Sequence, residues 1–160
     1  MAISQLQLQL QPDLIFAGII RALALLSLMA FIAICHIYND QIQTDMDAQA
    51  RIIIRTSLYV VAIVTFPLMK FMRHVLLRLN QRGKGERSAK SRYLVTIIIS
   101  MAVAETIGIY GFVMYILGDS FNTLYIFIIL SALAMYLYKP KVEEYQLIVE
   151  SIGPQRNSLD

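Results

Sequence analysis

Four long apolar runs constrain the fold of this chain more than any other feature. They cover residues 14–37, 52–69, 93–117 and 121–138. A helix rises about 1.5 Å per residue, so even the shortest of these runs reaches roughly 27 Å, close to the thickness of the hydrocarbon core of a bilayer. Backbone groups in lipid must pair within the protein, which leaves helices or a closed barrel, and these runs lack the alternation of barrel strands. The sequence therefore predicts an all-α membrane protein with four transmembrane helices in one domain, residues 14–138.

The composition of the chain agrees with this class and argues against others. Hydrophobic residues make up 58% of the 160 residues, the mean hydropathy is +0.60, and only 16% of the residues are charged. In soluble domains about a quarter of the residues are charged. Cys35 is the only cysteine, so an internal disulfide and a cysteine-based metal framework are excluded. The net charge of +3 comes from one connection, and we expect no nucleic-acid partner and no cofactor.

Shorter segments flank the predicted spans. Residues 1–13 predict a surface-lying or loosely ordered arm, with Pro12 suited to the first position of a helix. The first span lacks the preceding basic residues and the following small-residue site of a signal peptide, so we expect it to be retained. The second span is expected to extend toward residue 79 as a helix that leaves the membrane. Residues 139–160 predict a short amphipathic helix and a tail.

Basic residues gather in the connection between the second and third runs. Residues 70–92 contain eight lysines and arginines against Glu86 alone. The positive-inside rule places this connection in the cytoplasm, the acidic connection 38–51 outside and both termini inside, as in a bacterial inner (plasma) membrane protein. An alternative role for these residues is the binding of anionic lipid headgroups. The candidates for that role are Arg82, Lys84, Arg87 and Lys90.

One acidic side chain, Glu105, lies near the centre of the third run. A carboxylate at that depth costs about 3 kcal/mol on insertion scales, and acids inside spans generally face protein and serve a function. Burial also favours the neutral, protonated form of a carboxyl group. Glu105 is therefore the leading candidate for a proton- or cation-binding residue.

Two other positions are candidate partners of the Glu105 carboxyl. Arg21 lies two turns into the first run. Its guanidinium group either snorkels to the nearby interface or reaches toward Glu105, which lies roughly 8 Å deeper. Pro67 cannot donate a hydrogen bond to the carbonyl of Ile63, so this oxygen is freed at mid-membrane depth. A protonated Glu105 on a neighbouring span would donate to it.

Small residues mark the surfaces on which helices are expected to pack closely. Such residues recur every four positions and let another helix approach. They are Ser100, Ala104 and Gly108 in the third run, and Gly18 and Ala22 in the first. Glu105 edges the first of these stripes, which indicates that its side chain points into protein rather than lipid.

The stretch Ala104-Glu105-Thr-Ile-Gly-Ile-Tyr110-Gly111-Phe-Val113 resembles the carboxylate-bearing helix of the proteolipid (c) subunits of vacuolar-type rotary ATPases. The resemblance covers residues 102–113 and, as a plan, the helical hairpin 52–117. It implies that Glu105 is the proton- or cation-binding acid, with Tyr110 and Gly111 as supporting positions. Residues 52–69 contain no glycine and carry a proline, unlike the glycine-rich inner helix of that family. The resemblance thus implies a relative that keeps the acid-bearing helix, not an intact rotor subunit.

Two functions fit these features. The first is proton or cation binding at Glu105, in proton or ion translocation as part of an oligomer or complex. The second is a structural or assembly subunit of a larger membrane complex, with Glu105 as an interhelical hydrogen-bond anchor. Both imply a bilayer and either a homo-oligomer or a membrane complex. An enzyme is not expected, because Cys35 and His36 fall near one membrane face and His74 near the other, so no catalytic or metal set forms.

Overall fold

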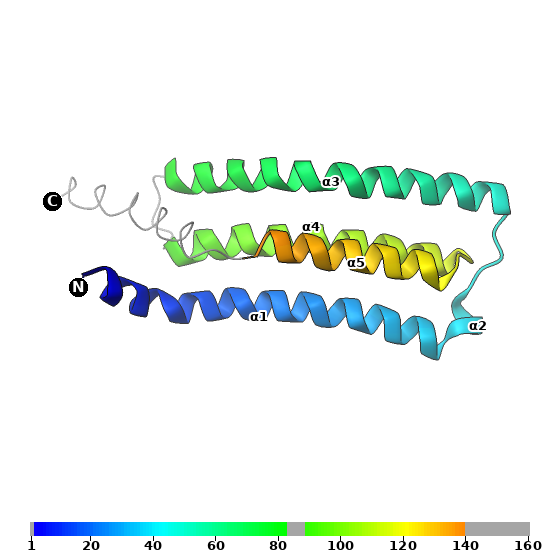
Figure 1. The fold of residues 1–160 in the computed structure, drawn as a ribbon, viewed down its shortest axis with the longest axis horizontal. Coiled ribbons are helices and arrows are strands. Elements are labelled where there is room, and N and C mark those ends of the chain that lie inside the picture. The colour runs from blue at the N-terminus through cyan, green and yellow to red at the C-terminus, as the bar shows by residue number, and fades with distance from the viewer. Residues whose placement is uncertain (1, 83–88, 140–160) are drawn as a thin grey trace.

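The computed structural model describes residues 2–82 and 89–139, and every regular element in these ranges is a helix (Figure 1). The prediction of an all-α protein is confirmed for these residues. In chain order the elements are α1 (Ala2–Ile37), the single-turn α2 (Asn39–Ile42), α3 (Ala48–Arg82), α4 (Ala89–Ile116) and α5 (Phe121–Leu137).

Three of the helices are long and apolar enough to cross a membrane, judged by length and composition. The apolar segments are Ile15–Ile37 of α1, Ala48–Leu79 of α3 and Tyr93–Ile116 of α4. Helix α5 is apolar but shorter, and its 17 residues rise roughly 26 Å, below the thickness of about 30 Å of a hydrocarbon core. The described residues thus include three helices long enough to cross a membrane and a fourth, shorter apolar helix.

Two helices extend beyond the predicted runs. Helix α1 continues back to Ala2, through the residues expected to form an arm, and Pro12 lies inside it. Helix α3 continues to Arg82, past the apolar segment, as a helix that leaves the membrane would. A helix pairs its own backbone groups, so it need not end where lipid ends. The predicted amphipathic segment lies outside the described residues, except for Lys139.

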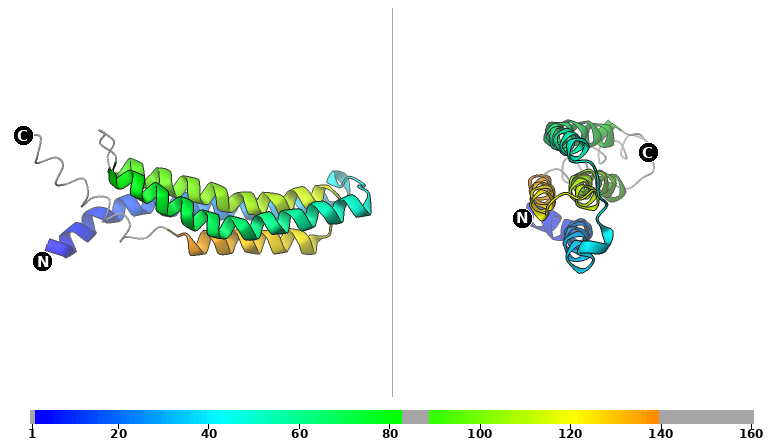
Figure 2. Two further views of the ribbon diagram at one scale, coloured as in Figure 1. Left: turned by 90° about the horizontal axis from the view of Figure 1, so that it is seen from above. Right: turned by 90° about the vertical axis from the view of Figure 1, so that its right-hand side faces the viewer.

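Helix α4 is the central element of the bundle. It packs most extensively against α5, and it also contacts α1 and α3. Helices α1 and α3 lie on opposite sides of the α4–α5 pair, and α1 and α4 run in the same direction (Figures 1 and 2). Most of the large side chains that are fully buried on α4 and α5 are apolar: Ile97, Met101, Ile107 and Met114 of α4, with Leu124, Phe127 and Met135 of α5.

The outer faces of α1 and α3 carry large exposed apolar side chains. Examples are Leu26 and Met29 on α1, and Ile53 and Leu68 on α3. Exposed apolar surface on this scale is unusual for a soluble monomer and suits contact with lipid chains. This distribution agrees with an integral membrane protein whose core forms around α4.

The end of the bundle that holds residues 38–47 and 117–120, here called the loop end, is tied together by hydrogen bonds. Helix α4 ends in a Schellman motif, in which Gly118 (φ +83°) donates to the carbonyl of Tyr115 (3.1 Å) and Asp119 donates to that of Met114 (3.0 Å). The left-handed backbone at this position favours glycine. A Cβ there would also lie 2.8 Å from the carbonyl oxygen of Thr44.

Arginines of α3 bind the same turn from the other side. Arg51 donates to the carbonyl of Gly118 (2.6 Å), and Arg55 forms an ion pair with the buried Asp119 (3.3 Å). Both guanidinium groups therefore lie near the C-terminal end of α4, where a positive charge is favourable. The turn holds α3 against α4 at this end of the bundle.

Candidate functional site

Glu105 lies on α4 and is hydrogen-bonded to a side chain of α1. Its carboxyl oxygen Oε1 contacts the hydroxyl oxygen of Ser27. Both side chains are partly buried within the chain. The contact joins two polar groups that would otherwise lie unpaired among apolar side chains, where each would cost free energy.

The Ser27 hydroxyl has a second partner on its own helix. Its oxygen lies 2.8 Å from the carbonyl oxygen of Ala24, three residues earlier. Ala24 and its neighbour Leu28 are buried on the face of α1 that packs toward the core. Three oxygen atoms, from Ala24, Ser27 and Glu105, therefore form a short polar chain between α1 and α4.

Ser27 was not among the residues predicted to contact Glu105. A signal for it was available, because Ser27 lies near the middle of the first run as Glu105 lies near the middle of the third. Helices α1 and α4 run in the same direction and contact one another, so the two middles come to similar depths (Figure 2). What the sequence did not reveal was that the first span packs against the third.

Arg21 and Glu105 are not joined in the structure. Among the residues that the structure describes, the one ion pair is Arg55–Asp119, and Arg21 lies six positions before Ser27, roughly 9 Å along α1. Its side chain is partly buried, and its Nε atom is buried without a hydrogen-bond partner. Arg21 therefore does not neutralise the carboxyl directly.

The predicted partnership of Ile63 with Glu105 is replaced by the contact with Ser27. Ile63 belongs to α3, on the other side of the α4–α5 pair from α1, and its side chain is 66% exposed. Glu105 turns toward α1, so its hydrogen bond goes to a hydroxyl group and not to the carbonyl near Pro67. The pairing fails because spans two and three contact through a different face of α4.

No protein-family model, curated protein or solved structure matches this chain. The resemblance to proteolipid subunits therefore still rests on residues 102–113 and on the plan of the hairpin 52–117.

Tyr110 and Gly111 lie on other faces of α4 than the carboxyl. Tyr110 is five residues from Glu105, about 140° around the helix, and its ring meets that of Phe127 edge-on (centroids 6.4 Å apart). A Cβ placed on Gly111 would lie 2.7 Å from the Cβ of Phe127 and 3.1 Å from the carbonyl oxygen of Leu124. In this structure both positions serve the packing of α4 against α5 and do not touch the acid.

The small residues of α4 lie at its interfaces with α5 and α1. Ser100 and Ala104 are almost fully buried, and the carbonyl of Ala104 accepts a hydrogen bond from Ser131 of α5 (2.7 Å). A Cβ on Gly108 would overlap the side chain of Leu28 of α1. The absence of side-chain bulk here lets α1 approach the helix that carries Glu105.

The pair of small residues on α1 does not pack against another described helix. Gly18 and Ala22 are exposed, and nothing lies within 4 Å of a Cβ placed on Gly18. The buried face of α1 is instead defined by Ala17, Ala24 and Cys35, which lie about 100° away from Gly18 around the helix. Gly18 and Ala22 therefore face away from the other described helices.

The other candidate residues lie near the ends of the bundle. Arg82 ends α3 and Lys90 lies in the first turn of α4, whereas Lys84 and Arg87 fall outside the described residues. Cys35 accepts a hydrogen bond at its carbonyl from Tyr115 (3.2 Å), and His36 pairs with Tyr125 (3.0 Å). Within residues 2–82 and 89–139, no three His, Cys, Asp or Glu side chains come together as a metal site would require.

Proposed function

We propose that this protein is a multi-pass integral membrane protein in which Glu105 binds and releases a proton inside the helix bundle. The observation that carries the proposal is the chain of oxygen atoms from Glu105 through Ser27 to Ala24. The four predicted spans, with both termini in the cytoplasm of a bacterial cell, form part of the same proposal. Proton or ion translocation within an oligomer or a larger complex is the role that such a residue would serve.

The number of protons in this chain of oxygens favours a protonated acid. A hydroxyl group has one proton to donate and two lone pairs to accept with. If Ser27 donates to the carbonyl of Ala24 (2.8 Å), its contact with Glu105 requires the carboxyl to supply the proton. If Glu105 is ionised, Ser27 must turn its proton toward the carboxylate and leave the carbonyl. The neutral acid satisfies both contacts at once.

Release of the proton is therefore coupled to a small rotation of one hydroxyl group. The carbonyl of Ala24 still accepts the backbone hydrogen bond of α1, so losing the hydrogen bond from Ser27 costs little free energy. The ionised carboxylate gains the hydroxyl as a donor in exchange. Two protonation states with alternative hydrogen bonds and similar packing are what a reversible proton site needs.

The same contacts favour a proton over a metal cation as the bound species. Calcium takes six to eight oxygen ligands, and magnesium requires six in near-octahedral geometry. The described contacts bring together oxygen atoms of three residues, and the carbonyl of Ala24 also belongs to a helix. The similarity of residues 102–113 to the acid-bearing helix of proteolipid subunits points to the same role.

A second function, that of a structural or assembly subunit, is favoured by the position of the hydrogen bond. Ser27 and Glu105 belong to different helices, so their contact fixes α1 against α4. Interhelical hydrogen bonds of this kind contribute about 0.6 kcal/mol on average in one membrane protein. This role needs hydrogen bonding by residue 105 but no titration.

Labelling with a hydrophobic carbodiimide tests the proton-binding function. The reagent reacts with protonated carboxyl groups in membranes, so wild-type protein in bilayers should be modified at Glu105, and more strongly at low pH. Peptide mass spectrometry locates the label, and Glu105→Gln should abolish it. Lack of modification in folded protein at every pH would count against the proposal.

Substitution of Glu105 separates the two functions. Glu105→Gln keeps hydrogen bonding and removes the titrating group, whereas Glu105→Ala removes both. If assembly of the protein and the growth of its host survive the Gln variant but not the Ala variant, the structural role is correct. If both variants fail in growth while the Gln variant still assembles, the proton is required.

A further inference from the structure

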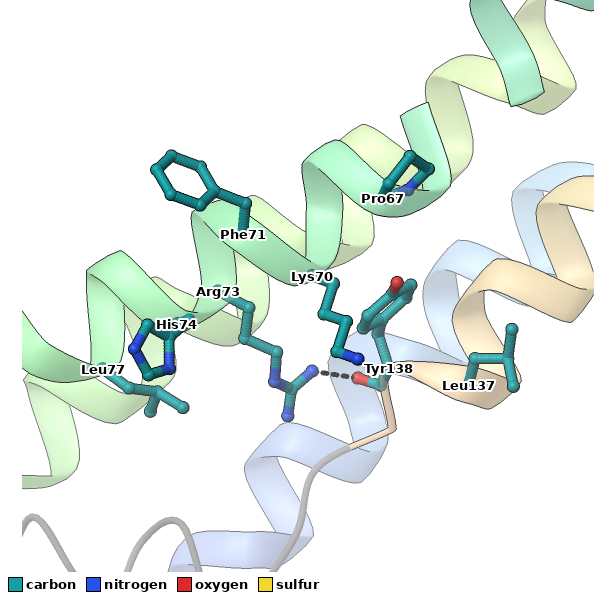
Figure 3. Close-up of a pocket in the computed structure, with 8 residues that line it drawn as sticks. All are labelled: Pro67, Lys70, Phe71, Arg73, His74, Leu77, Leu137 and Tyr138. Carbon is teal, nitrogen blue, oxygen red and sulfur yellow. Dashed lines mark hydrogen bonds between the residues drawn. The ribbon is translucent and has the colours of Figure 1, made fainter. Parts of the chain in front are cut away.

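A pocket of about 700 Å³ lies between α3 and the C-terminal end of α5 (Figure 3). This is the end of the bundle opposite the loop end, and the residues of α3 that line the pocket lie in the last part of its apolar segment. The pocket is separate from Glu105, which faces α1. It therefore calls for an explanation that does not depend on the proton site.

Three basic side chains line this pocket. Lys70, Arg73 and His74 follow one another along α3, and Figure 3 shows Lys70 and Arg73 extended toward the end of α5. The eight described residues that line the pocket include no acidic side chain. The described residues of this pocket therefore contribute positive charge, which favours an anionic ligand.

Arg73 already has a structural role. It is only 6% exposed, and its two terminal nitrogens donate to the carbonyls of Tyr138 and Lys139 (3.1 Å to the latter), where α5 ends. A cation at this position pairs with the carbonyl groups that the end of a helix leaves free. Capping of α5 therefore accounts for Arg73, and it leaves the two neighbouring basic groups unexplained.

Lys70 and His74 are exposed, and the structure gives neither a hydrogen bond nor an ion pair with the described residues. They lie one turn apart on α3, so both can reach the same ligand. An ammonium group and an imidazole side by side over a buried guanidinium are suited to the oxygen atoms of a phosphate group.

The remaining walls of the pocket are apolar. Pro67, Phe71 and Leu137 line it, and the last two are 66% and 51% exposed. An apolar wall directly beside a cluster of positive charges, at the end of membrane-length helices, matches a molecule with a phosphate group and hydrocarbon chains. Basic pockets between transmembrane helices bind anionic lipid headgroups in the same way.

We propose that this pocket binds the phosphate group of an anionic phospholipid, which Lys70 and His74 contact directly while its acyl chains lie along Phe71 and Leu137. Arg73 is a positioning residue, since it fixes the end of α5 against α3 and keeps a positive charge beneath the phosphate. The lipid would then join α3 to α5 at the end of the bundle opposite the ion pair of the loop end.

Native mass spectrometry of the full chain in detergent tests this assignment. Wild-type protein should retain phosphatidylglycerol in preference to phosphatidylcholine with the same acyl chains. Lys70→Gln and His74→Gln should each weaken retention of phosphatidylglycerol, by about tenfold if each removes one charge-assisted contact. Arg78→Gln, which removes a charge from an exposed side chain of α3 outside the pocket, should leave retention unchanged.

A parallel experiment with inorganic phosphate distinguishes the sources of the phosphate group. If inorganic phosphate competes with phosphatidylglycerol, and Lys70→Gln weakens the binding of both to the same extent, the pocket is a phosphate site. Its assignment to a lipid is then overturned. Equal retention of the two lipids, or an equal loss in Lys70→Gln and Arg78→Gln, would overturn the site itself. Circular dichroism of each variant establishes that the helices are retained.

Discussion

The hydroxyl group of Ser27 on α1 and the carboxyl group of Glu105 on α4 satisfy one another in the middle of two membrane-length helices. Ser27 is the one hydroxyl-bearing residue of 22–35, and Glu105 is the one charged residue of 93–117. Their contact explains how α4 carries an acid at this depth, and it links the packing of α1 to the protonation of Glu105.

A double-mutant cycle measures the strength of this contact. Ser27→Ala and Glu105→Ala each remove one partner of the contact and should each destabilise the protein, but the double variant should lose less than the sum of the two. The expected coupling is about 0.6 kcal/mol, the average for such pairs in one membrane protein, where the largest value is about 1.7 kcal/mol. Unfolding by titration with sodium dodecyl sulfate in mixed micelles provides the free energies.

The control for this cycle is Ser57→Ala. The Ser57 hydroxyl is exposed and bonds only to the carbonyl of Ile53 within α3 (2.9 Å). Its removal should be additive with Glu105→Ala. Coupling of equal size in the two cycles would show that the effect does not come from the contact between Ser27 and Glu105.

The approach of α5 to α4 should depend on Gly111. A methyl group there would lie 2.7 Å from the Cβ of Phe127 and close to the backbone of Leu124, and backbone yields less readily than a flexible side chain. We expect Gly111→Ala to destabilise the protein by about 1 to 3 kcal/mol through overpacking.

Gly18→Ala is the matched substitution at a position with open space around it. It should be neutral or stabilise by up to about 1 kcal/mol, because alanine has the higher helix propensity. The same unfolding titration compares the two variants. A larger loss at Gly18 than at Gly111 would mean that a partner covers the exposed face of α1 or that α5 packs elsewhere.

The sequence predicts the helices well because each apolar run must be helical in lipid whatever surrounds it. Residues 93–117 and 121–138 lie almost entirely within α4 and α5 for this reason. The extension of α3 was expected toward residue 79, and the helix continues to Arg82. The extension of α1 back to Ala2 is not determined by lipid, and hydropathy does not reveal it.

The site was harder to predict than the helices. Glu105 stands out because an acid in an apolar run is costly, but a hydrogen-bond partner on another helix depends on which helices are neighbours. Arg21 and Ile63 were candidates by depth, and Ser27 is the partner because α1 packs against α4. Periodicity within one helix carries no information about that pairing.

The ion pair at the loop end should stabilise the turn between α4 and α5. Asp119 is 6% exposed, pairs with Arg55 (3.3 Å) and accepts a hydrogen bond from the backbone of Ser120 (2.8 Å). Because Arg55 is about one third exposed, solvent weakens the pair. We expect Asp119→Ala to cost about 1 to 2 kcal/mol, less at high salt.

Asp45→Ala serves as the comparison, since Asp45 is an exposed acid in the same end of the bundle. It removes the same charge and should change the free energy of unfolding by less than about 0.5 kcal/mol. Equal losses in the two variants would indicate that net charge, not the contact with Arg55, sets the stability of this end.

Cysteine labelling tests the four-span topology. In a background with Cys35→Ala, cysteines are introduced at Arg78, Ser120 and Lys139, all of which are exposed. Four spans predict that a membrane-impermeant maleimide labels Ser120→Cys in intact cells, and the other two only after permeabilisation. Labelling of Ser120→Cys and Lys139→Cys from the same side would mean that α5 does not cross the membrane.

A measurement of the protonation state of Glu105 tests proton binding by this side chain most directly. Infrared spectra of the protein in lipid bilayers, recorded across a pH series, resolve the carbonyl stretch of a protonated carboxyl group from the bands of carboxylates. The account predicts a protonated-carboxyl band that disappears reversibly as the pH is raised, is absent from Glu105→Gln and shifts in Ser27→Ala. A spectrum without that band at any pH, or a band that persists unchanged in Glu105→Gln, would contradict it.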